Sequence, residues 1–257
     1  MSPTEFRANP ARDPSRAPDP TGLLRVGAWA AIASVALIVV QIAVFAAWPP
    51  PERVPEIFEL MQRNPALGIL SLDGLYIVNN LLVVLMYLAL AATLARPAPS
   101  LTAIALTFGL IGIASYMASN PAFELLVLAG RAAQATGDAA ASLEAGGEAL
   151  LASWRGTAFL VYYELGAIVL LIWVAAMVRT GVYGRATMAW LLASGILMLV
   201  PSTAGIVGLV FGVASLVPWS VACILLARHW LRLVRTASGG PVAPRDTGED
   251  SPSAHHG

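Results

Sequence analysis

The sequence of 257 residues has no lysine, one cysteine and three histidines. Cys223 has no second thiol with which to form an internal disulfide, and no Cys/His cluster with the spacing of a zinc or iron–sulfur site is present. The 15 basic residues are all arginines, and 15 acidic residues balance them, so the net charge is zero. Without a basic surplus to attract phosphates, nucleic acid is excluded as an expected partner.

The few histidines also exclude several kinds of catalytic site. His229, His255 and His256 lie at or beyond the end of the last apolar segment, so no histidine pair can hold a haem within a helical bundle. The same positions exclude an intramembrane Ser–His dyad, and no HEXXH, Walker or Rossmann pattern occurs. The sequence therefore predicts no metal site, no cofactor and no catalytic residues, and the protein is not expected to be an enzyme.

Long apolar segments are what the sequence has in abundance. Hydrophobic residues make up 58% of the chain and charged residues 12%, and six long segments contain only two charged residues, Asp73 and Glu164. About 20 apolar residues in a helix cross the hydrocarbon layer, where every backbone polar group must be bonded internally. The sequence predicts an all-α, polytopic membrane protein with six transmembrane helices, at 26–47, 72–95, 101–119, 157–178, 186–204 and 206–227.

The fifth and sixth of these segments are separated only by a short uncharged stretch, 201–205 (PSTAG). A tight turn at this stretch gives two spans. The alternative is a single re-entrant hairpin, which would leave four full spans.

The arginines predict the orientation, because cytoplasmic loops are enriched in basic residues close to the spans. With the amino end inside, eleven arginines lie on the inner side: Arg7, Arg12, Arg16, Arg25, Arg96, Arg179, Arg185, Arg228, Arg232, Arg235 and Arg245. Four lie outside: Arg53, Arg63, Arg131 and Arg155. We expect both termini to be cytoplasmic and the protein to lie in a bacterial plasma membrane.

Outside the spans, composition predicts two disordered tails, 1–22 and 236–257, on either side of a transmembrane domain, 23–235. Within 49–66 the apolar residues fall on one helical face, which predicts a short helix lying on the outer surface. The Ala-rich connection 120–156, between the third and fourth spans, is expected to be helical. Its helices either cap the outer face or simply extend the two neighbouring spans beyond the lipid.

An intramembrane carboxyl is the first place to look for function, because a charged side chain is costly there unless it is paired or protonated. Glu164 lies deep in the fourth span, whereas Asp73 begins the second span, where an acid also suits a helix N-terminus. Four spans carry polar side chains at a similar depth in the outer half. The candidate ligand-binding residues are Glu164, Asn80, Asn79, Gln41, Tyr76, Asp73 and Tyr116. The alternative is that these groups only hold helices together through interhelical hydrogen bonds.

Several short motifs, together with the order of the spans, resemble a known bacterial family. They are 130–135 (GRAAQA), 156–159 (GTAF), 162–166 (YYELG), 177–179 (MVR) and 184–185 (GR). The chain is similar over residues 22–236 to the integral-membrane family called domain of unknown function 4386. This resemblance implies a six-helix bacterial membrane protein, and it implies no substrate or catalytic residue.

The sequence leaves three functional hypotheses open. The first is a non-catalytic membrane protein that binds a small ligand or lipid in an outer-half polar pocket, or acts as an accessory to another membrane component. The second is a proton- or cation-coupled secondary transporter that uses Glu164, and the third is a lipid-modifying enzyme. The lipid bilayer is the expected partner. The Gly208-x-x-x-Gly212 step serves either packing within the bundle or contact with a membrane-protein partner or a second copy.

Overall fold

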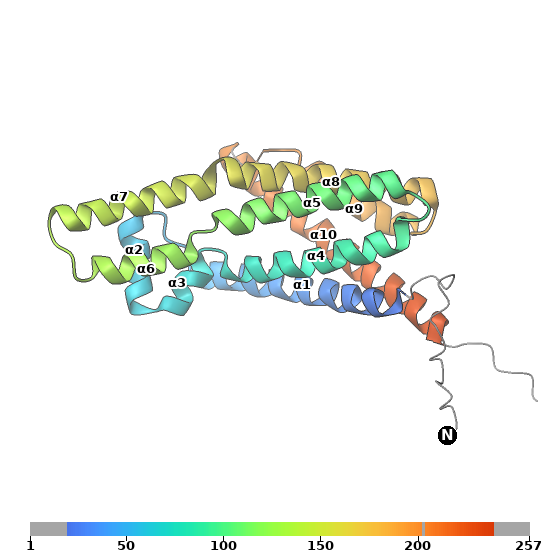
Figure 1. Ribbon diagram of the computed structural model, residues 1–257, viewed down its shortest axis with the longest axis horizontal. Coiled ribbons are helices and arrows are strands. Elements are labelled where there is room, and N and C mark those ends of the chain that lie inside the picture. The colour runs from blue at the N-terminus through green and yellow to red at the C-terminus, as the bar shows by residue number, and fades with distance from the viewer. Residues whose placement is uncertain (1–19, 202–203, 239–257) are drawn as a thin grey trace, which may run out of the picture.

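The computed structural model describes residues 20–201 and 204–238, and all regular structure within them is helical (Figure 1). Among these described residues, five helical stretches are long and apolar enough to cross a membrane, which supports the prediction of a membrane protein. They are built on α1 (Thr21–Ala47), α4 (Gly74–Leu94), α5 (Pro99–Ser119), α8 (Phe159–Thr180) and α10 (Gly205–Ser238).

The predicted fifth span forms a shorter helix, α9 (Arg185–Leu197), of 13 residues. A helix of this length rises about 20 Å, less than the roughly 30 Å of a hydrocarbon layer. The chain turns at 198–199 and then reaches Pro201, which lacks the backbone N–H needed to continue a helix. The predicted span 186–204 therefore ends early, and six crossings are not confirmed.

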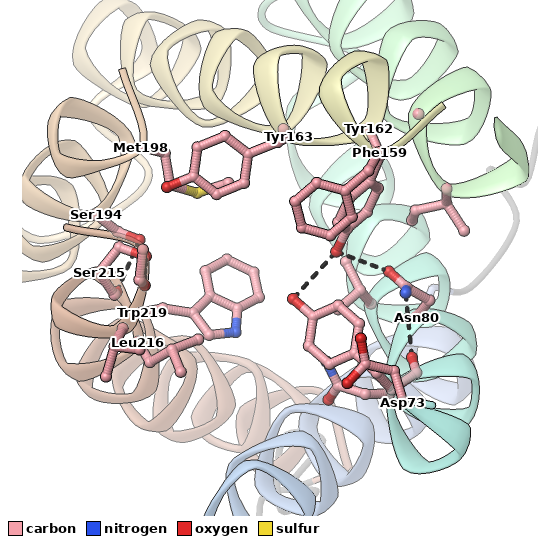
Figure 2. A pocket seen from close by; sticks show the side chains of 18 of the residues that line it. Asp73, Asn80, Phe159, Tyr162, Tyr163, Ser194, Met198, Ser215, Leu216 and Trp219 are labelled. Carbon is pink, nitrogen blue, oxygen red and sulfur yellow. Dashed lines mark hydrogen bonds between the residues drawn. The ribbon is translucent and has the colours of Figure 1, made fainter. Parts of the chain in front are cut away.

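Six helices form a closed ring, in the order α1, α4, α5, α8, α9 and α10, and α10 packs back on α1 (Figure 2). Near the chain termini the ring is filled by large side chains such as Trp173, Met177 and Trp230, each fully buried. The Trp230 indole Nε1 donates a 2.9 Å hydrogen bond to the Tyr183 hydroxyl, which also bonds Thr93 Oγ1 at 2.7 Å. We call this end of the bundle the terminal end.

The opposite end carries four helices that we call the cap: α2 (Val54–Arg63), α3 (Pro65–Ser71), α6 (Ala122–Ala132) and α7 (Asp138–Ser153) (Figure 1). The cap has its own apolar core, which includes Val54, Ile57, Phe58, Leu125 and Leu151. The prediction that 49–66 forms a helix lying on the outer surface is thus wrong about its packing, since the apolar face of α2 is buried against α6 and α7.

Two of the cap helices, α6 and α7, prolong the long helices α5 and α8, which is the arrangement of the extension hypothesis. Figure 1 shows α7 running on in the direction of α8, through a π-helical turn, η1 (Trp154–Ala158), in which Gly156 departs from helical geometry (φ −89°, ψ −132°). Between α5 and α6 the chain breaks at Asn120. The Asn120 side chain accepts from Ala122 N (3.1 Å) and donates to Leu72 O (2.9 Å), which ties this break to the start of α4.

The helices reach further than the predicted spans at both termini. α1 already begins at Thr21 and α10 continues to Ser238, so a few residues assigned to the tails 1–22 and 236–257 are helical. The remainder of both predicted tails lies outside the described residues.

Candidate functional site

A cavity of about 460 Å³ lies inside the helical ring, in the half nearer the cap (Figure 2). All six helices of the ring contribute side chains to it. Its volume falls within the range of roughly 300–1,000 Å³ that is typical of small-molecule sites. On α4 the lining runs from Asp73 to Tyr87, a rise of about 21 Å at 1.5 Å per residue, so the cavity is elongated along the bundle.

The cap end of the cavity is polar. The Tyr162 hydroxyl on α8 lies 3.1 Å from the Tyr76 hydroxyl and donates to Asn80 Oδ1, also at 3.1 Å. The Asn80 amide nitrogen donates to the Tyr76 carbonyl at 3.1 Å. These bonds fix two tyrosines and one amide against one another across the α4–α8 gap, as the dashed lines in Figure 2 show.

Aromatic rings gather around this polar end. The ring centroids of Tyr76 and Tyr162 are 6.3 Å apart, with the two planes perpendicular, and Phe159 lies 6.3 Å from Tyr162. Tyr116 packs behind them, 4.8 Å from Tyr162. Such a cluster rigidifies the wall and presents ring faces and edges to the cavity.

Asp73 is the N-cap residue of α4 and precedes the membrane-spanning segment Gly74–Leu94. Its backbone is left-handed (φ +60°), a conformation that Asp and Asn tolerate better than most residues. The Tyr116 hydroxyl donates a 3.2 Å hydrogen bond to Asp73 Oδ2. Burial raises the pKa of Asp73 to about 6, although the bond from Tyr116 opposes this shift.

Two buried polar side chains of the cavity wall have no hydrogen-bond partner. Gln41 on α1 is 8% exposed, and neither its amide nitrogen nor its amide oxygen is bonded. Tyr163 on α8 is 7% exposed, and its hydroxyl is unbonded. A Cβ added to Gly212 would lie 3.4 Å from that hydroxyl, so the glycine leaves it room. Because an unbonded buried polar group costs free energy, such groups are expected to meet a ligand or water.

The wall opposite the tyrosine cluster comes from α9 and α10. Ser194 Oγ donates a 3.1 Å hydrogen bond to the Ser215 carbonyl, so this hydroxyl already has a hydrogen-bond partner on the neighbouring helix. Met198, Leu216 and Trp219 make the remainder of this wall apolar (Figure 2). The cavity thus has one polar end and a longer apolar body.

Most of the residues predicted from the sequence meet at this cavity. Gln41, Asp73, Tyr76, Asn79 and Asn80 all line it, and Tyr116 lies directly behind it, bonded to Asp73. Asn79 also accepts a 2.7 Å hydrogen bond from Ser34 on α1, which is the interhelical packing role weighed as the alternative.

Glu164 does not share this position. It does not line the cavity, and one of its carboxyl oxygens is buried without a partner. It follows Tyr163, so its side chain leaves the helix about 100° further round. Glu164 was chosen from its distance along the predicted span, and such a distance does not say which way a side chain faces.

Several lining residues were not predicted from the sequence, namely Phe159, Tyr162, Tyr163, Ser194, Ser215 and Trp219. The first three recur on one face of α8 at spacings of three and four, which is a usable signal. The Gly208-x-x-x-Gly212 step also lines the cavity. Its glycines therefore make space inside the bundle.

The lining of the cavity carries little charge. Asp73 is the one formally charged residue among the described residues that line it, and no histidine, cysteine or arginine joins it there. No group of three or more metal-ligating side chains occurs in the part of the chain that the structure describes.

Comparison of the chain with protein-family models, curated proteins and solved structures gives no match. The resemblance to the family called domain of unknown function 4386 therefore stays a prediction.

Proposed function

We propose that this membrane protein is a non-catalytic binding protein that holds a small ligand in the cavity between its six ring helices. The observation that carries this proposal is the cavity of about 460 Å³ with the unbonded, buried amide of Gln41 in its wall. A ligand that bonds this amide would recover the free energy that its isolation costs. The single carboxyl of the lining, without a base or nucleophile beside it, supports binding over catalysis.

Native mass spectrometry of the purified protein tests this proposal, with three single-chain probes that differ only in headgroup: dodecylamine, dodecanol and dodecanoate. At least one probe should bind with a 1:1 ratio. Gly212→Leu, whose side chain would enter the cavity beside Tyr163, should abolish that binding. Gly130→Leu in the cap, where an added Cβ meets nothing within 4 Å, is the matched control and should bind as the wild type does. Binding of no probe, or binding unchanged by Gly212→Leu, would refute the proposal.

The transporter hypothesis assigns the coupling role to Glu164. Because this residue lies off the cavity, we expect Glu164→Gln to leave probe binding within two-fold of the wild type. Proteoliposome flux that follows an ion gradient and is lost in Glu164→Gln would favour transport instead.

We further propose that the terminal end faces the cytoplasmic side of a bacterial plasma membrane, with both termini in the cytoplasm, and that α9 together with the turn that follows it completes a sixth crossing. Arg25, Arg96, Arg179 and Arg185 lie within a few residues of helix ends away from the cap, in keeping with the basic bias of cytoplasmic loops.

Cysteine labelling tests this topology in a Cys223→Ser background. In intact cells, a membrane-impermeant maleimide should label Ala139→Cys in the cap but not Ala237→Cys near the end of α10, both positions being exposed. The reverse pattern, or labelling of both, would contradict the proposed orientation.

A further inference from the structure

Four of the six ring helices contribute only buried or half-buried residues to the cavity lining, whereas the other two contribute exposed residues as well. Lining residues on α4, α5, α8 and α9 are buried or half-buried. The exposed lining residues are three, and all lie on α1 or α10: Ile42 (48% exposed), Leu209 (60%) and Val213 (53%). The cavity is therefore accessible from the side, between these two helices.

The packing of α10 explains this opening. At the terminal end α10 touches α1, where a Cβ added to Gly27 would lie 3.5 Å from the Trp230 ring. Towards the cap α10 runs obliquely away from α1 (Figure 1), and Pro218 interrupts its backbone hydrogen bonding on the way. The two helices thus close the ring at one end and leave a gap at the other.

The gap lies at the depth of the lipid chains. Ile42 is five residues from the end of α1, and Leu209 and Val213 are four and eight residues from the start of α10. At 1.5 Å per residue these positions are about 6–12 Å in from the helix ends. The three exposed lining residues are apolar, and the half-buried Phe45 lies beside them on α1, so a molecule passing the gap comes from the bilayer rather than from water.

The cap end of the cavity favours a cationic headgroup. Asp73 is its one charged lining residue, and the rings of Tyr76, Phe159 and Tyr162 lie at the same end. Aromatic rings and a carboxylate attract an organic cation, whereas a phosphate or carboxylate headgroup would meet no basic side chain in this lining. The unbonded Gln41 oxygen and the Tyr163 hydroxyl are further acceptors for N–H donors.

We infer that the ligand is a hydrophobic amine with a single apolar chain, which enters sideways from the bilayer between α1 and α10 and places its amine against Asp73 and the tyrosine rings. This inference rests on the proposed binding function and names the ligand class and the route. The apolar chain of the ligand then lies in the part of the cavity that is nearer the terminal end, beside Leu216 and Trp219.

The headgroup is tested with the same three probes in nanodiscs. Dodecylamine should bind at least ten-fold more tightly than dodecanol, and dodecanoate should bind most weakly. Asp73→Asn keeps a residue that tolerates the left-handed backbone and removes only the charge. It should weaken dodecylamine binding at least ten-fold and leave dodecanol binding within two-fold. An amine preference that survives Asp73→Asn, or equal binding of dodecanoate, would overturn the assignment.

The route is tested by exchange of bound dodecylamine for its deuterated form. Val213→Trp places a large side chain in the gap at an exposed position and should slow exchange at least ten-fold. Val210→Trp is the matched control, because Val210 is equally exposed (57%) on α10 but does not line the cavity, and its exchange should match the wild type. Exchange at the wild-type rate in Val213→Trp would overturn lateral entry.

Different results would refute the binding function and the assignment of ligand class and route. If no probe binds, or Gly212→Leu has no effect, the binding function itself is wrong. If probes bind and Gly212→Leu abolishes binding while Asp73→Asn and Val213→Trp change nothing, the binding function stands and the ligand class and route are wrong.

Discussion

Tyr116 and Asp73 are joined by a 3.2 Å hydrogen bond from the phenol to the carboxyl, which ties α5 to the N-cap residue of α4. This bond orients the one charged group of the cavity lining. A second bond joins the same two helices, because Asn120, the C-cap residue of α5, donates to the carbonyl of Leu72 beside Asp73. The cap end of the cavity is therefore held by contacts between α4 and α5 as well as by the tyrosine cluster.

The raised pKa of Asp73 predicts a pH-dependent stability of the ligand-free protein. Burial raises this pKa from 3.8 to about 6, so the folded protein binds the proton more tightly than the unfolded chain does. The resulting stabilisation is complete below about pH 3.8 and is lost as the pH rises through 6. The titratable groups that face Asp73 are the phenols of Tyr76 on α4 and Tyr116 on α5, and a phenol ordinarily titrates at about pH 10, well above this range.

We therefore expect the Tm in detergent to fall between pH 4 and pH 7, and expect Asp73→Asn to remove that part of the fall. Glu144→Gln, at an exposed acid of the cap, should leave the wild-type slope unchanged. An identical slope in Asp73→Asn would show that another group is responsible.

Because the amide of Gln41 is unbonded, we expect its removal to raise the stability of the protein and to weaken ligand binding. Replacing this unbonded amide by leucine, Gln41→Leu, removes a buried polar group of similar size, so the free energy of unfolding without ligand should rise by about 1–2 kcal/mol. The same change should weaken dodecylamine binding at least five-fold. Gln62→Leu is the opposite control, because Gln62 donates a 2.9 Å hydrogen bond to the Ala129 carbonyl and its loss should destabilise the cap. Destabilisation by Gln41→Leu would show that the amide is already satisfied.

The sequence predicted the membrane helices well because charge is costly in hydrocarbon, and the absence of charge marks each segment directly. It overestimated the length of the fifth helix, because composition gives an uncharged segment of 19 residues whereas α9 ends at Leu197, ahead of Pro201. It did not predict α3, and it predicted a helix at the position of α2 but not its packing, because an amphipathic helix looks the same whether its apolar face meets lipid or other helices. Only the tertiary structure distinguishes the two.

Counting residues along each predicted span gives a depth for a side chain but no direction. Gln41, Asp73 and Asn80 converge because each also lies on the inner face of its helix. Glu164, chosen because it is the costliest residue of its segment, does not line the cavity, while its neighbour Tyr163 does. Residues one position apart differ by about 100° on a helix, so the choice between them needs the helix orientation.

We expect the loss of the Tyr183 hydroxyl to lower the stability of the protein without affecting ligand binding. Its hydroxyl bonds both Thr93 and the fully buried Trp230 at the terminal end, far from the tyrosine cluster. Burial raises the pKa of Tyr183 to about 12, so the hydroxyl stays protonated at ordinary pH. Tyr183→Phe leaves the indole N–H unbonded and should lower the free energy of unfolding by about 1–3 kcal/mol. Dodecylamine affinity should stay within two-fold of the wild type, and a larger loss would show that the two ends are coupled.

We expect alanine substitutions at two adjacent glycines of α7 to have different effects on the stability of the cap. A Cβ on Gly147 would lie 2.6 Å from Val54 Cγ1 and 3.3 Å from the Phe58 ring, so Gly147→Ala must push α2 away from α7. We expect it to destabilise the cap by about 1–3 kcal/mol despite the better helix propensity of alanine. Gly146→Ala meets only Leu128, at an ordinary 3.8 Å, and should be neutral or slightly stabilising. Trypsin cleavage at the exposed Arg131, in the last turn of α6, measures the difference, and equal cleavage rates in the two variants would mean that α2 does not pack as described.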